Sequence, residues 1–116
     1  MNPKQALLRE RAHILQGLPP LTEVVRGSLV ERLLRCGKPT CHCAQGAGHR
    51  VFYLTVSFAR GRTEQVTVPV ALVPVVQRWL RNYARWWDGL EAISAINRDL
   101  LRRRWLDAEG APRRRR

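Results

Sequence analysis

The first hydrophobic pattern along the chain is helical. Among the first sixteen positions, the apolar residues that recur at helical spacing are Leu7, Leu8, Ile14 and Leu15. Asn2 is a typical N-cap residue, and Pro3 suits the first helical position because its fixed φ matches the helix. Gly17, with two prolines shortly after it, stops the pattern. These residues predict a short amphipathic helix over residues 3–16.

The middle of the chain alternates apolar and polar residues with period two. Residues 51–59 follow this pattern and residues 63–68 repeat it, with a turn signal at Arg60-Gly61 between them, so the two segments predict a β-hairpin. Residues 28–35 fit a helix as well as a strand. Because a two-stranded hairpin alone is marginal, we expect them to supply a third strand.

Residues 74–106 carry a long helical pattern. The apolar positions alternate steps of four and three, which is a heptad pattern typical of helix pairing. A helix of this length extends about 50 Å, at a rise of 1.5 Å per residue, so it overhangs a small domain, bends or pairs. Gly89 is its weak point, since glycine costs about 1 kcal/mol relative to alanine. The expected pairing positions are Trp79, Tyr83, Trp86, Leu90, Ile93, Asn97 and Leu100.

Together these patterns predict a single α+β domain over residues 1–109. It consists of an N-terminal helix, a small antiparallel β-sheet within residues 27–68 and a long C-terminal helix. Residues 110–116 read Gly-Ala-Pro followed by four arginines, which predicts a disordered basic tail.

Charge adds a functional expectation. The chain has 21 Lys and Arg residues against 9 Asp and Glu residues, a net charge of +12. Such a field attracts polyanions, so we expect nucleic acid as the partner, DNA rather than RNA. An acidic protein partner would fit the same net charge. The arginines on the long helix would also fit a solvent-exposed helix face without a partner. The expected phosphate contacts are Arg60, Arg62, Arg78, Arg81, Arg85, Arg102, Arg103, Arg104, Arg113, Arg114, Arg115 and Arg116.

Membrane and secretory classes do not fit the sequence. No apolar run approaches the roughly 18–20 residues that span a bilayer. The N-terminal residues are too charged for a secretory signal. We therefore expect a cytoplasmic protein that contacts no membrane.

A cysteine cluster is the strongest chemical signal. Cys36, Cys41, Cys43 and His49 follow the spacing C-x4-C-x-C-x5-H. Three thiolates and an imidazole are a typical ligand set for structural zinc. Reduced cysteines in a turn without metal, or a redox role, are the alternatives, and His42 is a rival imidazole. An odd number of cysteines so close together argues against a disulfide framework.

The segment around these cysteines resembles a known family. The runs Gly27-Ser28-Leu29-Val30-Glu31-Arg32, Arg35-Cys36-Gly37-Lys38-Pro39, Cys41-His42-Cys43-Ala44, Gly48-His49 and Phe52-Tyr53-Leu54 are similar to those of a domain-of-unknown-function family of short bacterial proteins. The resemblance covers about residues 25–103. It implies a setting near transposases and mobile elements and assigns no activity.

The sequence therefore predicts a small basic accessory protein that binds nucleic acid in a mobile-element or defence nucleoprotein machine. No nucleophile–base pair, phosphate-binding loop or paired carboxylate site is visible, so we expect no enzyme activity. The alternative is a protein–protein adaptor that dimerises or docks through the long helix. Salt separates the two, because nucleic-acid affinity falls steeply as salt rises.

Overall fold

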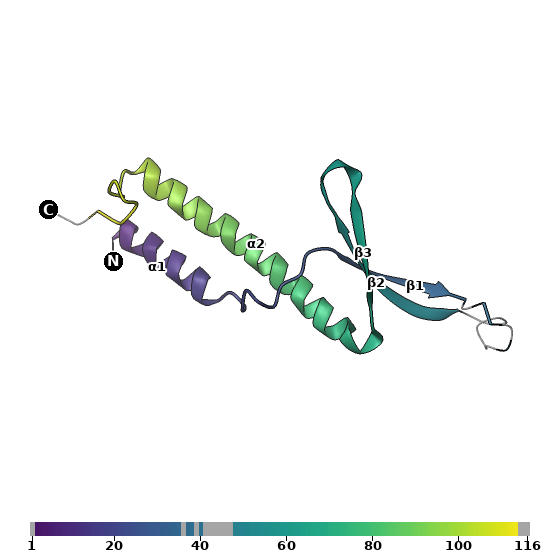
Figure 1. Ribbon diagram of the computed structural model, residues 1–116. Coiled ribbons are helices and arrows are strands. Elements are labelled where there is room, and N and C mark those ends of the chain that lie inside the picture. The colour runs from purple at the N-terminus through teal and green to yellow at the C-terminus, as the bar shows by residue number, and fades with distance from the viewer. Residues whose placement is uncertain (1, 36, 39, 41–47, 114–116) are drawn as a thin grey trace. The chain divides into compact units, whose positions relative to one another are not determined.

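A computed structural model of the chain describes residues 2–35, 37, 38, 40 and 48–113. These residues form a short and a long α-helix and one three-stranded antiparallel sheet, so the predicted α+β class is confirmed (Figure 1). The chain divides into two compact units. Met1–Pro20 and Ala84–Arg116 make up the helical unit, and Leu21–Tyr83 makes up the sheet unit.

Helix α1 spans Pro3–Gln16, the range that the sequence predicts. The backbone N–H of Gln5 donates to Asn2 Oδ1 at 2.8 Å, and Gln5 Oε1 accepts from the Asn2 N–H at 3.5 Å. This reciprocal pair is a capping box, which satisfies two backbone donors that the first turn leaves without helical partners. The backbone N–H of Gly17 then closes the helix on the carbonyl of His13. The local sequence therefore sets both ends of α1.

The sheet has the order β1-β2-β3 and both pairs are antiparallel. Strand β1 spans Ser28–Leu34, β2 spans His49–Ser57 and β3 spans Thr63–Val68. The predicted hairpin and the predicted third strand are thus both confirmed. A short 3-10 turn, η2 (Ala59–Gly61), connects β2 to β3.

One face of the sheet carries the core of its unit. Leu54 at the centre of β2 pairs with Leu29 on one side and Val66 on the other. Leu54 and Val68 are buried, whereas Val66 is 46% exposed although its pattern predicts an inward side chain. Strand β3 is an edge strand that is buried only at its last residue, and this leaves Val66 open to solvent.

Within the sheet unit, the segment that precedes β1 makes polar contacts with residues 79 and 82. The amide of Asn82, which is 8% exposed, donates to the Glu23 carbonyl at 2.8 Å. The backbone N–H of Val25 donates to the Trp79 carbonyl at 3.2 Å. Gly27 follows with a φ of 142°, and a Cβ there would lie 2.7 Å from the Thr55 carbonyl oxygen. The chain therefore needs a glycine at the point where it enters β1.

Helix α2 spans Val73–Arg102, after a 3-10 turn η3 (Val70–Leu72). Residues 73–83 belong to the sheet unit and residues 84–102 to the helical unit. The sequence predicts a helix to residue 106, but Arg104 takes a left-handed φ of 56°. The N–H of Trp105 donates to the Leu100 carbonyl and that of Arg104 to the Leu101 carbonyl, both at 3.0 Å. This Schellman-type end lacks the usual glycine, so the sequence carries no stop signal.

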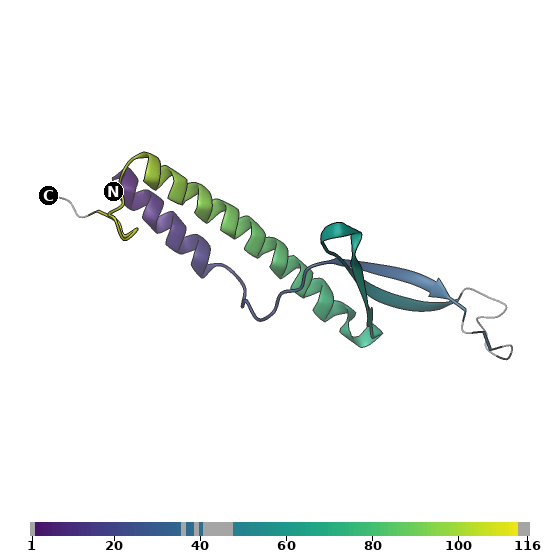
Figure 2. The same ribbon diagram turned by 45° about the horizontal axis from the view of Figure 1, so that its top comes forward.

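In the helical unit, α1 lies alongside residues 84–102 of α2 (Figures 1 and 2). Ile96 and Leu100 are buried, and the Trp86 indole N–H donates to the Pro19 carbonyl at 2.9 Å. Gly89 is buried as well, with a Leu18 methyl group at 2.8 Å from the position that a Cβ would take. The predicted weak point of the helix is thus a site of close packing.

Residues 105–113 fold back on the helical unit. Asp107 Oδ1 accepts from the backbone N–H groups of Glu109 and Ala111, and the Arg113 N–H donates to the Trp105 carbonyl at 2.8 Å. Residues 110–113 thereby form an ordered turn where the sequence predicts the start of a disordered tail. The Asp107 carboxylate caps this turn, and that contact is not evident from composition. No helix in the described ranges is both long enough and apolar enough to cross a lipid bilayer.

Candidate nucleic-acid interface

The turn between β2 and β3 presents arginine side chains at one end of the sheet. The backbone N–H of Phe58 donates to the Arg62 carbonyl at 2.7 Å and closes the turn. Inside it, Arg60 and Gly61 have φ values of 64° and 72°. A left-handed conformation costs an arginine about 1 kcal/mol, so the pairing of the two strands imposes it. The turn leaves Arg60 exposed.

Three arginines gather around this turn with one aromatic ring. The guanidinium carbon of Arg62 lies 4.5 Å from the centroid of the Phe58 ring, and that of Arg26 lies 5.2 Å from it. Arg26 also donates to the Ser57 carbonyl at 2.9 Å. Cation–π contacts hold a guanidinium in place without neutralising its charge. We refer to Arg26, Phe58, Arg60 and Arg62 as the hairpin-tip cluster.

The positive charge of the hairpin-tip cluster is not compensated. Within the described part of the chain, none of its three arginines forms an ion pair. Arg50 on β2 provides the contrast, because its Nε lies 2.6 Å from Glu31 Oε1. That hydrogen bond lowers the pKa of the Glu31 carboxyl and raises the pKa of Arg50. Among the described residues, Arg50 is therefore paired with a carboxylate, whereas the three arginines of the hairpin-tip cluster are not.

Two further arginines lie over aromatic rings of the sheet. Arg32 lies 5.9 Å from the Tyr53 centroid, and Arg50 lies 5.8 Å from the Phe52 centroid. Tyr53 is half-buried on the face that also carries Thr55. This polar face can offer a ring and hydroxyl groups to a ligand, with less unpaired charge than the tip.

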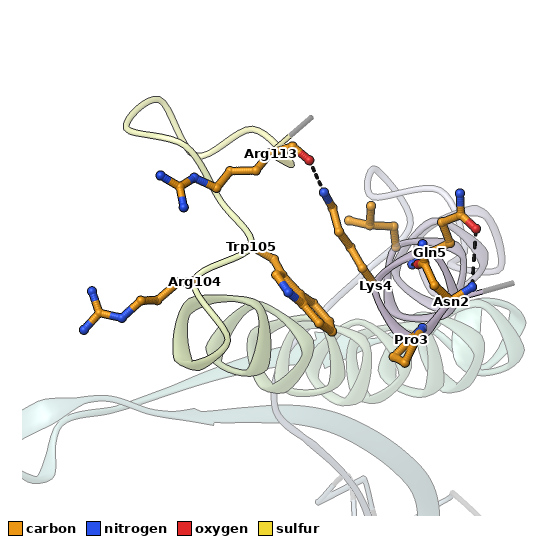
Figure 3. A pocket seen from close by; sticks show the side chains of 8 residues that line it. Asn2, Pro3, Lys4, Gln5, Arg104, Trp105 and Arg113 are labelled. Carbon is orange, nitrogen blue, oxygen red and sulfur yellow. Dashed lines mark hydrogen bonds between the residues drawn. The ribbon is translucent and has the colours of Figure 1, made fainter. Parts of the chain in front are cut away.

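A second basic site lies in the helical unit, where the first turns of α1 meet the segment that follows α2 (Figure 3). A pocket of about 610 Å³ is lined by Lys4 of α1 and by Arg104, Trp105 and Arg113 after α2. The Lys4 ammonium donates to the Arg113 carbonyl, and the guanidinium groups of Arg104 and Arg113 point away from α1. Arg103 lies 5.0 Å from the Trp105 ring. We call Lys4, Arg104, Trp105 and Arg113 the terminal pocket.

Several predicted phosphate contacts on α2 are paired within the protein. Arg78 lies 3.7 Å from a Glu23 oxygen. Arg102 and Arg103 share Asp99, at 2.8 and 3.4 Å. These carboxylates reduce the charge that such arginines offer to a ligand, and the exposed pairs contribute little to stability.

The remaining arginines have different settings. Arg85 donates to the Gly17 carbonyl at 2.5 Å and so binds the end of α1. Arg81 is exposed. The structure does not describe Arg114, Arg115 or Arg116, so their predicted contacts are untested.

Of the four predicted zinc ligands, the structure describes His49. His49 begins β2 and pairs with Leu34 in the β1–β2 register. Cys36, Cys41 and Cys43 fall outside the described residues. Among the residues that are described, no three His, Cys, Asp or Glu side chains gather as metal ligands. The zinc site stays a prediction from the sequence.

The predicted pairing positions are divided between the two units. Trp79 and Tyr83 belong to the sheet unit, and the indole N–H of Trp79 is buried without a hydrogen-bond partner among the described residues. Trp86 and Leu100 contribute to the interior of the helical unit, and Ile93 is half-buried there.

Leu90 and Asn97 have different settings among the predicted pairing positions. Leu90 is 55% exposed, whereas its neighbour Gly89 packs against Leu18. Asn97 Oδ1 accepts from Arg11 of α1 at 2.8 Å, so its amide is used within the chain. The inner face of α2 is therefore rotated by about one residue at these positions.

Sequence reasoning missed Arg26 and Lys4. Arg26 follows from the register, since Ser28 opposite Thr55 brings Arg26 beside Ser57. That register depends on the connection between β1 and β2, which no local pattern fixes. Lys4 joins the terminal pocket through a contact 109 residues away in sequence.

Comparison with known proteins gives a family without an assigned activity. No curated protein and no solved structure matches the chain. Residues 4–78 match the family described as Domain of unknown function (DUF6788), a range that includes α1 except its first residue, the whole sheet and the hairpin-tip cluster. Since the match covers more than half of its residues, this chain belongs to the DUF6788 family.

Proposed function

We propose that this protein binds nucleic acid, with the hairpin-tip cluster as its principal phosphate contact. The observation that carries the proposal is that the three arginines of the hairpin-tip cluster, two of which lie over the Phe58 ring, lack carboxylate partners in the described part of the chain. Guanidinium groups bind phosphate oxygens through two parallel hydrogen bonds, which makes arginine well suited to a phosphate backbone. A rigid hairpin offers these groups without the entropic cost of ordering a loop.

The terminal pocket supplies a second contact region. Trp105 offers a ring on which a base can stack, and Lys4, Arg104 and Arg113 line the same pocket and add positive charge. The net charge of +12 favours encounter with any nucleic acid. Neither region presents an array of donors and acceptors suited to one base sequence. We therefore propose binding that depends mainly on the phosphate backbone, with DNA as the preferred partner.

The biological setting that we propose is that of an accessory protein in a nucleoprotein machine. The resemblance of the segment around Cys36, Cys41 and Cys43 to bacterial proteins near transposases supports a mobile element as that setting. A chain this small can bind and position nucleic acid while another subunit performs the chemistry.

A matched pair of variants tests the proposed contact. Arg60→Ala/Arg62→Ala removes two unpaired charges, and Arg50→Ala/Arg78→Ala removes two charges that lie beside Glu31 and Glu23 in the same unit. Fluorescence anisotropy with labelled duplex DNA and with RNA of the same sequence measures the dissociation constants. We expect the first pair to weaken binding at least tenfold, and the second pair to weaken it by less than about threefold.

Two results would contradict the proposal. Equal losses in the two double variants would mean that total charge, and not the hairpin tip, governs binding. If wild-type protein bound neither DNA nor RNA at low salt, the proposal of nucleic-acid binding would be wrong. Binding to a protein partner that persists at high salt would instead favour the adaptor role.

A further inference from the structure

Helix α2 carries a second apolar stripe that no part of the described chain covers. Trp87, Leu90 and Leu101 are 57%, 55% and 63% exposed. With Ser94 between them, their spacings of three, four and seven place all four on one face of the helix. We call Trp87, Leu90, Ser94 and Leu101 the outer stripe. Exposed large apolar side chains in a row are typical of an interaction surface.

The helical unit has an incomplete core. Helix α1 buries none of its described residues fully, and in this unit the buried apolar side chains are Ile96 and Leu100 among those described. Two helices leave the outer sides of both exposed, whereas four helices enclose a core between them. On α2, the outer stripe lies next to the face occupied by Trp86 and Gly89, which contact residues 18 and 19. A second pair of helices on the outer stripe would complete a bundle.

Charges beside the outer stripe indicate what covers it. Glu91 and Arg98 lie on the same edge of the stripe, seven residues apart, on the side opposite Trp86. The helix gives Glu91 no cation at the third or fourth position in either direction, and it gives Arg98 no carboxylate there. Within the described residues neither forms an ion pair, and Arg98 donates only to Ser94 Oγ, at 3.0 Å.

This edge is complementary to itself when one helix is reversed. A two-fold axis near Ser94 brings Glu91 of one copy opposite Arg98 of the other, and the same pair forms a second time by symmetry. In a parallel arrangement the two Glu91 side chains would share one level and the two Arg98 side chains another. The small Ser94 at the centre lets two helices approach closely.

We propose that the protein forms an antiparallel homodimer through the outer stripe, closed by reciprocal Glu91–Arg98 ion pairs. The dimer joins two helical units into a four-helix arrangement. This inference goes beyond nucleic-acid binding and does not depend on it. A two-fold dimer would present two basic sites to one ligand.

Charge reversal tests the dimer directly. Protein freed of nucleic acid is examined by sedimentation velocity and light scattering across a dilution series. Wild-type protein is expected at twice the chain mass of 13.4 kDa. Glu91→Arg and Arg98→Glu each place like charges opposite one another twice, so each is expected to raise the dimer dissociation constant at least tenfold. The double variant Glu91→Arg/Arg98→Glu restores opposite charges and is expected to return within about threefold of wild type.

The control is Glu109→Arg, which makes the same change of charge on an exposed residue beyond α2. It is expected to leave the dissociation constant unchanged. Circular dichroism confirms that each variant keeps its helix content. A wild-type protein of single-chain mass at the highest concentration overturns the proposal. A double variant no tighter than the single ones, or a control as weak as Glu91→Arg, overturns it as well.

Discussion

Leu18 fills the space that Gly89 leaves on α2. A Cβ at position 89 would lie 2.8 Å from Leu18 Cδ2 and 3.1 Å from Cδ1, closer than side-chain atoms normally approach. The chain after α1 can therefore pack against α2 because a helical residue without a side chain stands opposite an apolar one. Among the described residues of α2, Gly89 is the only glycine, so this close contact can form on only one face of the helix.

The first prediction concerns this pair. Gly89→Ala gains about 1 kcal/mol of helix propensity but displaces Leu18, so we expect no gain in the wild-type background. In a Leu18→Ala background the space is free, and Gly89→Ala is expected to raise the free energy of unfolding by about 1 kcal/mol. Chemical denaturation of the four proteins measures the coupling. Equal effects of Gly89→Ala in both backgrounds would show that Leu18 does not fill the gap.

The second prediction concerns the end of α2. Arg104 has a φ of 56°, a conformation that glycine adopts without strain. We expect Arg104→Gly to raise the free energy of unfolding by about 0.5–1 kcal/mol. Arg102→Gly is the matched control, because residue 102 is helical and the same change should lower stability by about 1 kcal/mol. Destabilisation by Arg104→Gly would rule out the left-handed helix end.

The third prediction concerns acid. The hydrogen bond from Arg50 lowers the pKa of Glu31 below its ordinary value of 4.5; desolvation of the carboxylate acts in the other direction, and the positive charge of Arg50 lowers the pKa further. A carboxyl with a lower pKa in the folded state stabilises the fold above pH 4.5, and this contribution disappears as the pH falls through the folded pKa. We expect Glu31→Gln to lower the free energy of unfolding at pH 7. We also expect the variant to lose less of that free energy than wild type when the pH falls below 4.5.

Urea denaturation between about pH 3 and pH 7 measures this effect. Glu64→Gln on β3 is the control, since Glu64 forms no ion pair within the described residues. If Glu31→Gln and Glu64→Gln showed the same dependence of stability on pH, the Glu31–Arg50 pair would not account for the effect.

The fourth prediction concerns zinc, which only the sequence supports. If Cys36, Cys41, Cys43 and His49 bind the metal, purified protein carries about one zinc per chain and chelation lowers its melting temperature. His49→Ala is expected to lower zinc affinity more than His42→Ala, because the spacing selects His49. Elemental analysis by mass spectrometry measures the content. If metal-free protein were folded and as stable as the protein before chelation, the zinc-site prediction would be wrong.

Local signals predicted the elements of the fold accurately. Asn2 and Pro3 define the start of α1 through capping, which acts within one turn. Period-two alternation and the Arg60-Gly61 turn defined the hairpin, because side-chain alternation follows directly from strand geometry. Each of these features depends on residues a few positions apart.

Features that depend on distant contacts were not predictable. The heptad pattern of α2 does not show that Leu18 packs against Gly89, because that contact joins residues about seventy positions apart. The end of the helix depends on Arg104 in a conformation that arginine rarely takes. Arg26 and Arg62 meet at Phe58 only once the register of three strands is fixed. The number of arginines predicted a positively charged binding surface. Only the fold shows which arginines lie beside carboxylates and which do not.

The salt dependence of binding tests the central claim most directly. Protein purified free of nucleic acid is titrated into labelled duplex DNA at several salt concentrations, and the logarithm of the association constant is plotted against that of the salt concentration. Three phosphate contacts at the hairpin tip predict a linear fall with a slope of about −2.7, steeper if the terminal pocket also binds. Arg60→Ala/Arg62→Ala should reduce the slope by about 1.8. An association constant that does not change with salt, or an absence of binding at low salt, would contradict the account.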